Sequence, residues 1–186
     1  MESGLIPDTA TQYDAAMAQC FDIFVKKTED YGTAWRVLRT ISITDQLYIK
    51  AQRIRTIQEK GTQKIDDSIG SEFIAIVNYA VIGNIQLSLA DDAPEELEVE
   101  AARTLYRDQT TVAKELMQAK NHDYGEAWRG MSQESFVDLI LMKLLRIRQI
   151  ITNGGKTLIS EGIDANYFDI INYGLFALIK INERKT

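Results

Sequence analysis

Apolar side chains recur along most of the chain at spacings of three and four residues, which is the pattern of helices that bury one face. The first such run contains Tyr13, Ala16, Met17, Cys20, Phe21, Phe24 and Val25. Apolar and polar residues do not alternate for long enough anywhere to predict a strand. The pattern predicts long helices over about residues 9–27, 42–60 (capped by Ser42 or Thr44), 67–89, 94–119, 133–152 and 160–181, and short helical turns over residues 34–38 and around Trp128.

Glycines mark the predicted ends of several of these helices. Gly32 and Gly125 each follow a helical run within the sequence Asp-Tyr-Gly, and Gly61 follows the second helix. Glycine is the residue that most readily adopts the left-handed conformation after a helix. Residues 153–155, Asn-Gly-Gly, predict a further break, and the acidic segment 91–100 predicts a linker.

The chain repeats one segment nearly unchanged. The sequence KTEDYGTAWR at residues 27–36 returns as KNHDYGEAWR at residues 120–129, a shift of 93 residues that becomes 94 beyond the second helix of each copy. The other aligned pairs are Ser42 with Ser135, Asp45 with Asp138, Lys50 with Lys143, Arg53 with Arg146, Arg55 with Arg148, Asp67 with Glu161, Asn78 with Asn172, and Tyr79 with Tyr173. A self-match over most of a chain indicates two copies of one supersecondary unit.

The repeat predicts a single domain, residues 1–186, built from copies at about residues 9–90 and 94–182. Each copy alone would have a thin core, so the two copies are expected to bury their apolar faces against each other. We therefore predict an all-α fold, a duplicated antiparallel helical bundle with three helices per copy. An internal pseudo-twofold axis is expected to relate the two Asp-Tyr-Gly loops.

The charge balance restricts the partners of the protein. Its 186 residues include 27 acidic and 21 basic side chains, a net charge of −6, and no run of Lys or Arg. Binding to nucleic acid or to an anionic membrane surface is therefore not expected. Neither a signal peptide nor the roughly 18 consecutive apolar residues of a membrane span is evident. The single cysteine, Cys20, fits a reducing compartment. We expect a cytoplasmic protein, either a monomer or a homodimer.

The last predicted helix carries a polar stripe. Glu161, Asp169 and Asn172 stand at i, i+8 and i+11 on one face, and Asp164 lies about a turn beyond Glu161. The stripe adjoins an apolar face, where carboxylates need a cation or hydrogen-bond donors to stay ionised. Because oxygen ligands suit Mg²⁺ or Mn²⁺, the stripe predicts a site for one of these ions.

The preceding helix brings charges of both signs. Glu134 and Asp138 lie one turn apart, and Lys143 and Arg146 follow them. Basic side chains beside a metal site would neutralise a phosphate chain, while a metal-bound water could attack phosphorus. His122 is the only histidine, which excludes a histidine-rich zinc site.

Taken in order, these residues resemble the family named nucleotide modification associated domain, which is similar in turn to the all-α, MazG-like nucleoside triphosphate pyrophosphohydrolases. The resemblance covers nearly the whole chain, once per copy, and the second copy matches better. The matching residues are Lys120, Asn121, Asp123, Tyr124, Gly125, Lys143, Arg146, Glu161, Asp164, Asp169, Asn172 and Tyr173. In the first copy, Ala75 and Gly70 stand where the second has Asp169 and Asp164, so the resemblance implies a site built mainly by the second copy.

MazG-like enzymes hold Mg²⁺ with a Glu-x-x-Glu pair on one helix and a Glu-x-x-Asp pair on the next. Here Glu161 and Asp164 supply the second pair, whereas Glu134-x-x-x-Asp138 replaces the first. The resemblance implies the metal ligands Asp138, Glu161, Asp164 and Asp169, of which Glu161, Asp169 and Asp138 would be catalytic. It implies phosphate contacts from Lys120, Lys143 and Arg146, and further substrate contacts from Asn121, Asp123, Tyr124 and Asn172, with Asn172 or Tyr124 on the sugar or base.

Two functional hypotheses and one structural interpretation follow. The first hypothesis is Mg²⁺-dependent hydrolysis of a nucleoside triphosphate, or a related nucleotide, to the monophosphate and pyrophosphate. The second is a non-catalytic nucleotide-binding or protein-interaction module, which the missing Glu-x-x-Glu pair favours. In the structural interpretation, the Asp-Tyr-Gly-x-Ala-Trp-Arg segment ends a helix and packs, Lys143 and Arg146 pair with acids, and the polar stripe is a buried network that fixes helix packing.

Overall fold

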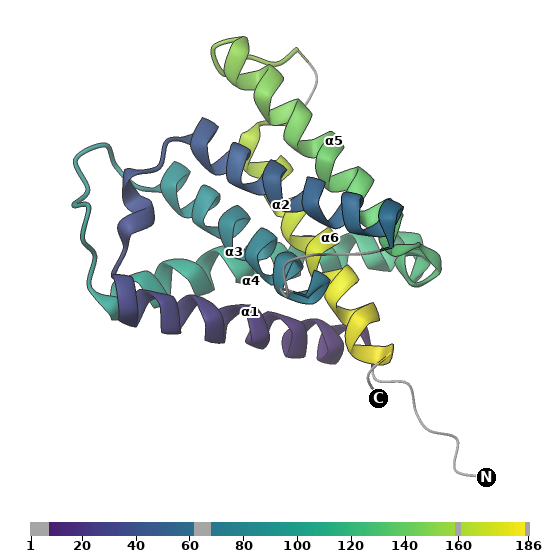
Figure 1. Cartoon of the computed structure of the whole chain (residues 1–186). Coiled ribbons are helices and arrows are strands. Elements are labelled where there is room, and N and C mark those ends of the chain that lie inside the picture. The colour runs from purple at the N-terminus through teal and green to yellow at the C-terminus, as the bar shows by residue number, and fades with distance from the viewer. Residues whose placement is uncertain (1–7, 62–67, 159–160, 185–186) are drawn as a thin grey trace.

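The computed structural model describes residues 8–61, 68–158 and 161–184, and every regular element within these ranges is helical (Figure 1). The long helices are α1 (Thr9–Tyr31), α2 (Thr40–Lys60), α3 (Ile69–Ser88), α4 (Val99–Tyr124), α5 (Gln133–Thr152) and α6 (Ile163–Arg184). The short 3-10 helices η1 (Ala34–Val37) and η2 (Ala127–Gly130) follow α1 and α4. The predicted all-α helical bundle is confirmed, whereas the pseudo-twofold axis and the MazG-like arrangement stay predictions.

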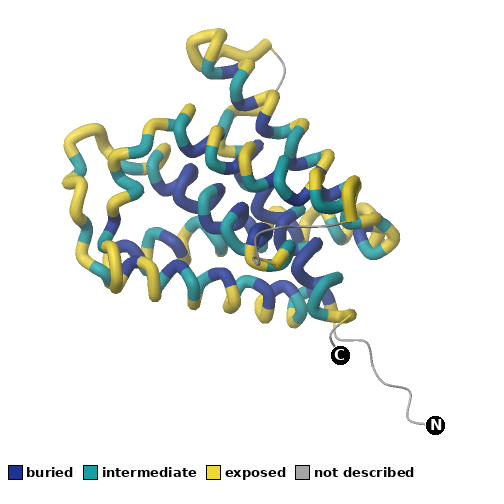
Figure 2. Tube along the Cα trace, viewed as in Figure 1, coloured by how far each residue is buried: buried dark blue, intermediate teal, exposed yellow. Residues whose placement is uncertain are grey.

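The six long helices stack in three layers, and each layer pairs one helix from each sequence repeat. The central layer is α3 with α6, which share the most extensive contact between any two helices. The pair α2 and α5 covers one side of this layer, and α1 and α4 cover the other (Figure 1). Figure 2 accordingly shows α3 and α6 as the most continuously buried helices. One buried apolar cluster includes residues from all six long helices.

Glycines end α1, α2 and α4 as the sequence predicted. Gly32, Gly61 and Gly125 each follow the last helical residue and donate their backbone N–H back into the final turn. Gly61 and Gly125 are left-handed, with φ of 69° and 59°, a conformation that costs a residue without a Cβ very little. The Gly125 N–H, for example, lies 2.9 Å from the carbonyl oxygen of Asn121.

Helices α1 and α4 are longer than the apolar pattern predicted. They end at Tyr31 and Tyr124, whereas the pattern placed their ends near residues 27 and 119. Their final turns carry mainly polar side chains, which add nothing to an apolar periodicity. The capping glycine sets the end of each helix, and the Tyr of each Asp-Tyr-Gly sequence is the last helical residue.

The cap predicted for α2 is wrong. The helix begins at Thr40, before both Ser42 and Thr44, and no side chain caps its first turn. The Thr44 hydroxyl instead donates within the helix to the carbonyl oxygen of Thr40, at 2.8 Å. The starts predicted for α3 and α6, at residues 67 and 160, lie outside the described residues.

Helix α4 begins at Val99 and not near residue 94, so the linker between α3 and α4 covers residues 89–98, close to the predicted 91–100. The Thr33 hydroxyl donates to the carbonyl oxygen of Glu95 at 2.8 Å and accepts a hydrogen bond from the Leu97 N–H at 2.9 Å. These bonds hold the loop against the segment that precedes η1, so its backbone groups are satisfied without helix formation.

Two glycines allow α3 and α6 to approach closely. A Cβ atom on Gly83 of α3 would lie 2.7 Å from the ring of Tyr167 on α6. A Cβ atom on Gly174 of α6 would lie 2.7 Å from a methyl carbon of Val77 on α3. Both distances are too short for a real side chain, so these glycines set the spacing of the central layer.

Replacing Gly83 with alanine is expected to lower the melting temperature. Overpacking a core costs about 1–3 kcal/mol, more than the roughly 1 kcal/mol that alanine gains over glycine in a helix. The matched control is Gly70→Ala in the first turn of α3, where the added Cβ would meet its nearest neighbour at an ordinary 3.6 Å. Thermal unfolding followed by circular dichroism compares the two variants. An equal rise in melting temperature for both would contradict the close approach.

Two buried tyrosine–asparagine pairs connect the repeats. The Tyr13 hydroxyl on α1 donates to Asn172 Oδ1 on α6, and the Tyr106 hydroxyl on α4 donates to Asn78 Oδ1 on α3, each at 2.7 Å. Each asparagine amide nitrogen also donates to a backbone carbonyl of its own repeat, at 3.1 and 3.0 Å. The two copies therefore share buried polar contacts as well as the apolar cluster.

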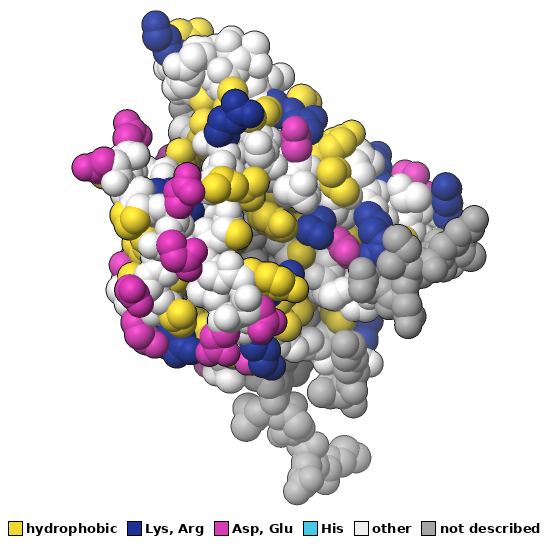
Figure 3. Space-filling view, turned by 60° about the vertical axis from the view of Figure 1, so that its left-hand side comes forward, with side chains coloured by type: hydrophobic (Ala, Val, Ile, Leu, Met, Phe, Trp, Pro, Cys, Tyr) yellow, Lys and Arg dark blue, Asp and Glu magenta, His cyan; other side chains and the backbone are white. Residues whose placement is uncertain are grey.

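The surface of the bundle carries charges of both signs. On the face turned forward in Figure 3, acidic and basic side chains are interspersed, with hydrophobic side chains exposed between them. None of the described helices combines the length and the hydropathy that a membrane crossing requires.

Candidate functional site

A pocket of about 240 Å³ opens between α4, η2 and α6 in the second repeat. The residues that define this aromatic pocket are Met117, Lys120, Asn121, Tyr124, Ala127, Trp128, Met131, Asp169, Asn172, Tyr173 and Phe176. Trp128 stacks on Phe176, with ring centroids 4.4 Å apart and planes 7° from parallel. Aromatic rings and methionine side chains thus form much of the wall, and Lys120, Asn121 and Asp169 bring polar groups to it.

Three charged residues from three helices meet at one edge of the aromatic pocket. One carboxylate oxygen of Asp169 on α6 lies 2.7 Å from Nζ of Lys120 on α4. The other oxygen lies 2.8 Å from Nζ of Lys143 on α5. The sequence predicted that these residues belong to one site. However, it assigned Asp169 to a metal and the lysines to phosphate, whereas in the structure they pair with one another.

The pairing keeps this buried carboxylate ionised. Asp169 is only 9% exposed, and burial alone would raise its pKa, but hydrogen bonds and charges from Lys120 and Lys143 hold the pKa below its ordinary value. Burial works against the charged form of Lys120 as well, yet the bond to Asp169 raises the pKa of that lysine. The carboxylate of Asp169 and the ammonium group of Lys120 are therefore both charged near neutral pH.

A second, larger cavity of about 870 Å³ adjoins this cluster, between the C-terminal half of α5 and the start of α6. The residues that define this cationic cleft are Lys143, Arg146, Gln149, Ile150, Asn153, Lys156, Thr157, Leu158, Glu161 and Asn166. Three of them are cationic and one is acidic. Because Lys143 lines the cleft and pairs with Asp169 of the aromatic pocket, the two cavities meet at this ion pair.

Two cations of the cleft, Arg146 and Lys156, make no side-chain hydrogen bond or ion pair with residues of the described ranges. In the first repeat, by contrast, the aligned Arg53 lies 2.9 Å from Glu72, and Lys50 lies 3.7 Å from the same carboxylate. The residue of the second repeat that aligns with Glu72 is Asn166, which is neutral. The loss of one acid therefore leaves the cationic cleft open to an external anion.

The carboxylates predicted to bind metal do not form a cluster. Asp138 is 62% exposed and faces Arg55 on α2 at 4.0 Å. Glu161 lies in the cationic cleft, and Asp164 is exposed in the first turn of α6. Within the described ranges, no three acidic, histidine or cysteine side chains come together as a metal site would need. The residues in this arrangement do not fit a Mg²⁺ ion held by the four carboxylates, and the metal stays an untested prediction.

Four further residues predicted to bind substrate are placed differently from one another. Asn121 lines the aromatic pocket and donates to Glu126 at 2.7 Å. Tyr124 stands at the rim of that pocket and is 73% exposed. Asp123 does not line the pocket; its carboxylate lies at the surface, 3.1 Å from His122. Asn172 lines the pocket, but its side-chain amide is already hydrogen-bonded within the bundle, to Tyr13 and to a backbone carbonyl.

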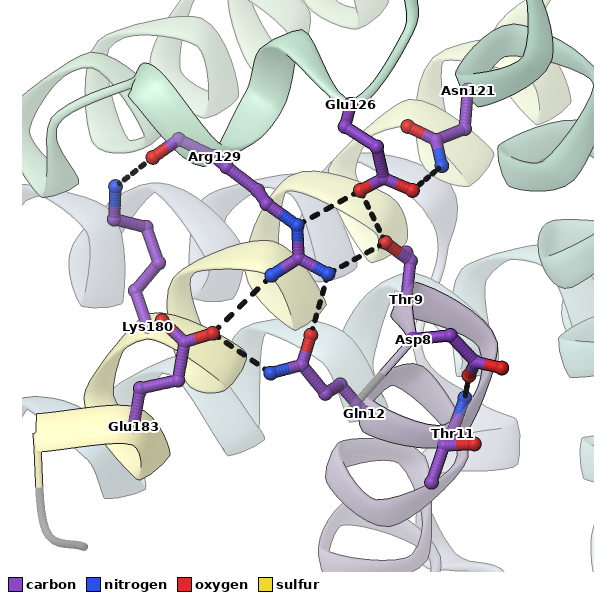
Figure 4. A network of polar contacts seen from close by, with 9 residues as sticks. All are labelled: Asp8, Thr9, Thr11, Gln12, Asn121, Glu126, Arg129, Lys180 and Glu183. Carbon is purple, nitrogen blue, oxygen red and sulfur yellow. Dashed lines mark hydrogen bonds and ion pairs between the residues drawn. The ribbon is translucent and has the colours of Figure 1, made fainter. Parts of the chain in front are cut away.

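The Trp-Arg end of the repeated motif holds the pocket in place. Figure 4 shows the guanidinium of Arg129 between Glu126, Thr9, Gln12 and Glu183, at distances of 2.8–3.3 Å. The same guanidinium lies 4.6 Å from the ring of Trp128. This network ties η2 to the first turn of α1 and the last turn of α6. It fixes Trp128 in the pocket wall. The structural interpretation expected the tyrosine of the motif to pack as well, but Tyr31 and Tyr124 are exposed.

Glu126 is the acidic centre of that network. It has a positive φ of 65°, which is uncommon for a residue with a side chain. Burial alone would raise its pKa, but hydrogen bonds from Thr9, Asn121 and Arg129 hold the pKa below its ordinary value. These bonds stabilise the turn that leads from α4 into η2.

The sequence did not assign the aromatic wall to a site. The sequence indicated only packing for Trp128, and it signalled no role for Phe176, Met131 or Lys156. One signal was present, because the chain has two tryptophans, Trp35 and Trp128, and both occupy the same position of the repeat. A second signal was that Glu72 of the first copy aligns with a neutral residue, Asn166, in the second copy.

A family model described as nucleotide modification associated domain 1 matches the chain twice, over residues 27–87 and 120–181. The two matches fall within the two copies of the sequence repeat, and together they cover more than half of the chain. They include η2, most of the aromatic pocket and all of the cationic cleft. No curated protein and no solved structure matches the chain.

Proposed function

Because the chain belongs to the nucleotide modification associated domain 1 family, we propose that its second repeat binds a nucleotide. The base occupies the aromatic pocket, and the phosphate groups lie in the cationic cleft. The observation that carries the proposal is that the two cavities meet at the Lys143–Asp169 ion pair.

The aromatic pocket suits a flat heterocycle. Stacking of a base on an aromatic side chain contributes about 1–3 kcal/mol, and Tyr124 and Tyr173 offer ring surface here. The hydroxyl of Tyr173 makes no hydrogen bond within the described part of the chain. Burial raises the pKa of this hydroxyl, with a further rise from the charge of Asp169, so it remains a donor for a polar edge of the base.

The cationic cleft suits a phosphate chain. Arg146 has no acidic partner in the part of the chain that the structure describes, and it can form a charge-assisted, bidentate contact with phosphate oxygens. Lys143 and Lys156 add positive charge along the same cavity. The acidity of the whole chain does not oppose this, because the charge that matters is the local one.

Nucleotide binding is expected to depend on Arg146. Removing one charge-assisted contact costs about 1.5–3 kcal/mol, so Arg146→Ala should weaken triphosphate binding by about tenfold or more and leave binding of the nucleoside unchanged. Isothermal titration with the common nucleosides and their triphosphates measures both. The matched control is Arg148→Ala on the same helix, since Arg148 pairs with Asp45 and does not line the cleft. Equal affinities of all three proteins for triphosphate would contradict the proposal.

The same proposal holds that binding occurs without hydrolysis, because the predicted metal ligands are dispersed. Incubation with canonical and modified nucleoside triphosphates plus Mg²⁺ should release no pyrophosphate above the background. Asp169→Asn should leave nucleotide binding nearly intact. If pyrophosphate is released and Asp169→Asn abolishes the release, the pyrophosphohydrolase hypothesis is the better one.

A further inference from the structure

The first repeat has a pocket of its own, between α1, η1 and α3. It is larger than the aromatic pocket, at about 390 Å³, and it is lined by residues that include Lys27, Tyr31, Trp35 and Tyr79. These four stand at the positions of the repeat that Lys120, Tyr124, Trp128 and Tyr173 occupy in the second copy. The aromatic and basic elements of the wall are therefore present in both repeats.

The two pockets differ in one charge. Ala75 lines the first-repeat pocket at the position that aligns with Asp169. Lys27 is exposed and makes no hydrogen bond or ion pair with residues of the described ranges. Its counterpart Lys120 is bonded to Asp169. The first-repeat pocket therefore presents an ammonium group whose charge no carboxylate of the described residues balances.

The positive charge at the first-repeat pocket does not extend into a cleft. Lys50 and Arg53, which align with the cations of the cationic cleft, both pair with Glu72. The carboxylate of Glu72 is buried between them, so a phosphate chain would have to displace it. One anionic group can be balanced here, by Lys27, but not a chain of three.

We propose that the first-repeat pocket is a second binding site, which takes a planar aromatic molecule carrying a single anionic group, as in a nucleoside monophosphate. The ring packs among Tyr31, Trp35 and Tyr79, and the anionic group pairs with Lys27. This site uses none of the residues of the aromatic pocket or the cationic cleft. It can therefore be tested independently of the function proposed for the second repeat.

The two tryptophans of the chain make the test direct, because each lines one pocket. In the Trp128→Phe protein Trp35 is the one tryptophan, so its fluorescence can be excited selectively. Titration with the four common nucleoside monophosphates should change this fluorescence saturably. The corresponding nucleosides should bind at least about fivefold more weakly, since they lack the anionic group. Lys27→Gln in the same background should remove that difference. The matched control is Lys26→Gln, because Lys26 pairs with Asp22 and does not line the pocket.

A second variant tests the charge exchange between the repeats. Ala75→Asp places a carboxylate where the second repeat has one, and it should weaken monophosphate binding by about tenfold or more by pairing with Lys27. The absence of a saturable change of Trp35 fluorescence would overturn the proposal. Binding that is weakened by neither Lys27→Gln nor Ala75→Asp would also overturn it. If Ala75→Asp fails to fold, Lys27→Gln alone tests the proposal, because Lys27 is exposed and its replacement should not disturb the fold. In the Trp35→Phe protein, Trp128 reports binding at the aromatic pocket alone. Failure of the function proposed for the second repeat can therefore be distinguished from failure of the first-repeat site.

Discussion

Replacing Asp169 with alanine is expected to lower the free energy of unfolding by about 3 kcal/mol, the lower end of the cost of breaking a buried ion pair. The cost arises at Lys143, whose side chain is only 12% exposed and would lose the carboxylate that it is bonded to. Lys120 contributes less, because its side chain is 55% exposed and can be solvated by water. Urea unfolding at pH 7 measures the difference.

The control for this prediction is Asp138→Ala. Asp138 is also acidic and also faces a basic residue, but at 4.0 Å and with a mainly exposed side chain. Its loss should cost less than about 0.5 kcal/mol. Equal costs for the two variants would show that the charged cluster at Asp169 does not stabilise the fold.

The effect of Asp169 should also depend on pH in a defined direction. Its pKa is lower in the folded chain than in the unfolded chain, so the unfolded state binds more protons in acid. The stabilisation is therefore complete above about pH 4, the ordinary pKa of an aspartate, and is lost as the pH falls through the folded pKa. The stability difference between the wild type and Asp169→Ala should shrink in that range.

The bundle could be predicted from the sequence because helix periodicity and glycine caps are local signals. The apolar pattern placed α5 at residues 133–152, and the structure has it at Gln133–Thr152. Where the prediction was wrong, a contact distant in sequence decided the outcome. Helix α4 begins at Val99 and not at the predicted position, because Thr33 of the other repeat binds the backbone of the linker.

The site was predicted less completely, for a physical reason. Periodicity puts Asp169 and Lys143 on inward faces of neighbouring helices, but it does not say which groups will touch. A carboxylate between two lysines and a carboxylate on a metal have the same sequence pattern. The comparison of the two copies was more informative, because the exchanges of Glu72 for Asn166 and of Ala75 for Asp169 mark where each repeat lacks a counter-charge.

Replacing Asn172 with alanine is expected to cost about 2–3 kcal/mol of unfolding free energy, because the buried Tyr13 hydroxyl would lose its acceptor. Burial raises the pKa of Tyr13, so the hydroxyl stays a donor that must be satisfied. Tyr13→Phe should cost about 1–2 kcal/mol, and the double variant less than the sum of the two single costs. Tyr124→Phe, at an exposed tyrosine, is the control and should change little.

The double-mutant cycle of Tyr13→Phe and Asn172→Ala also decides between two roles for Asn172. The sequence predicted that this residue contacts the sugar or base. If the residue is structural, Tyr13→Phe and Asn172→Ala should show a coupling energy of about 1 kcal/mol, and nucleotide affinity of the folded variants should stay near that of the wild type. If Asn172 binds the ligand directly, Asn172→Ala should weaken nucleotide binding while Tyr13→Phe does not. The 2.7 Å bond to Tyr13 and the second bond to a backbone carbonyl favour the structural role, because they already engage both ends of the amide.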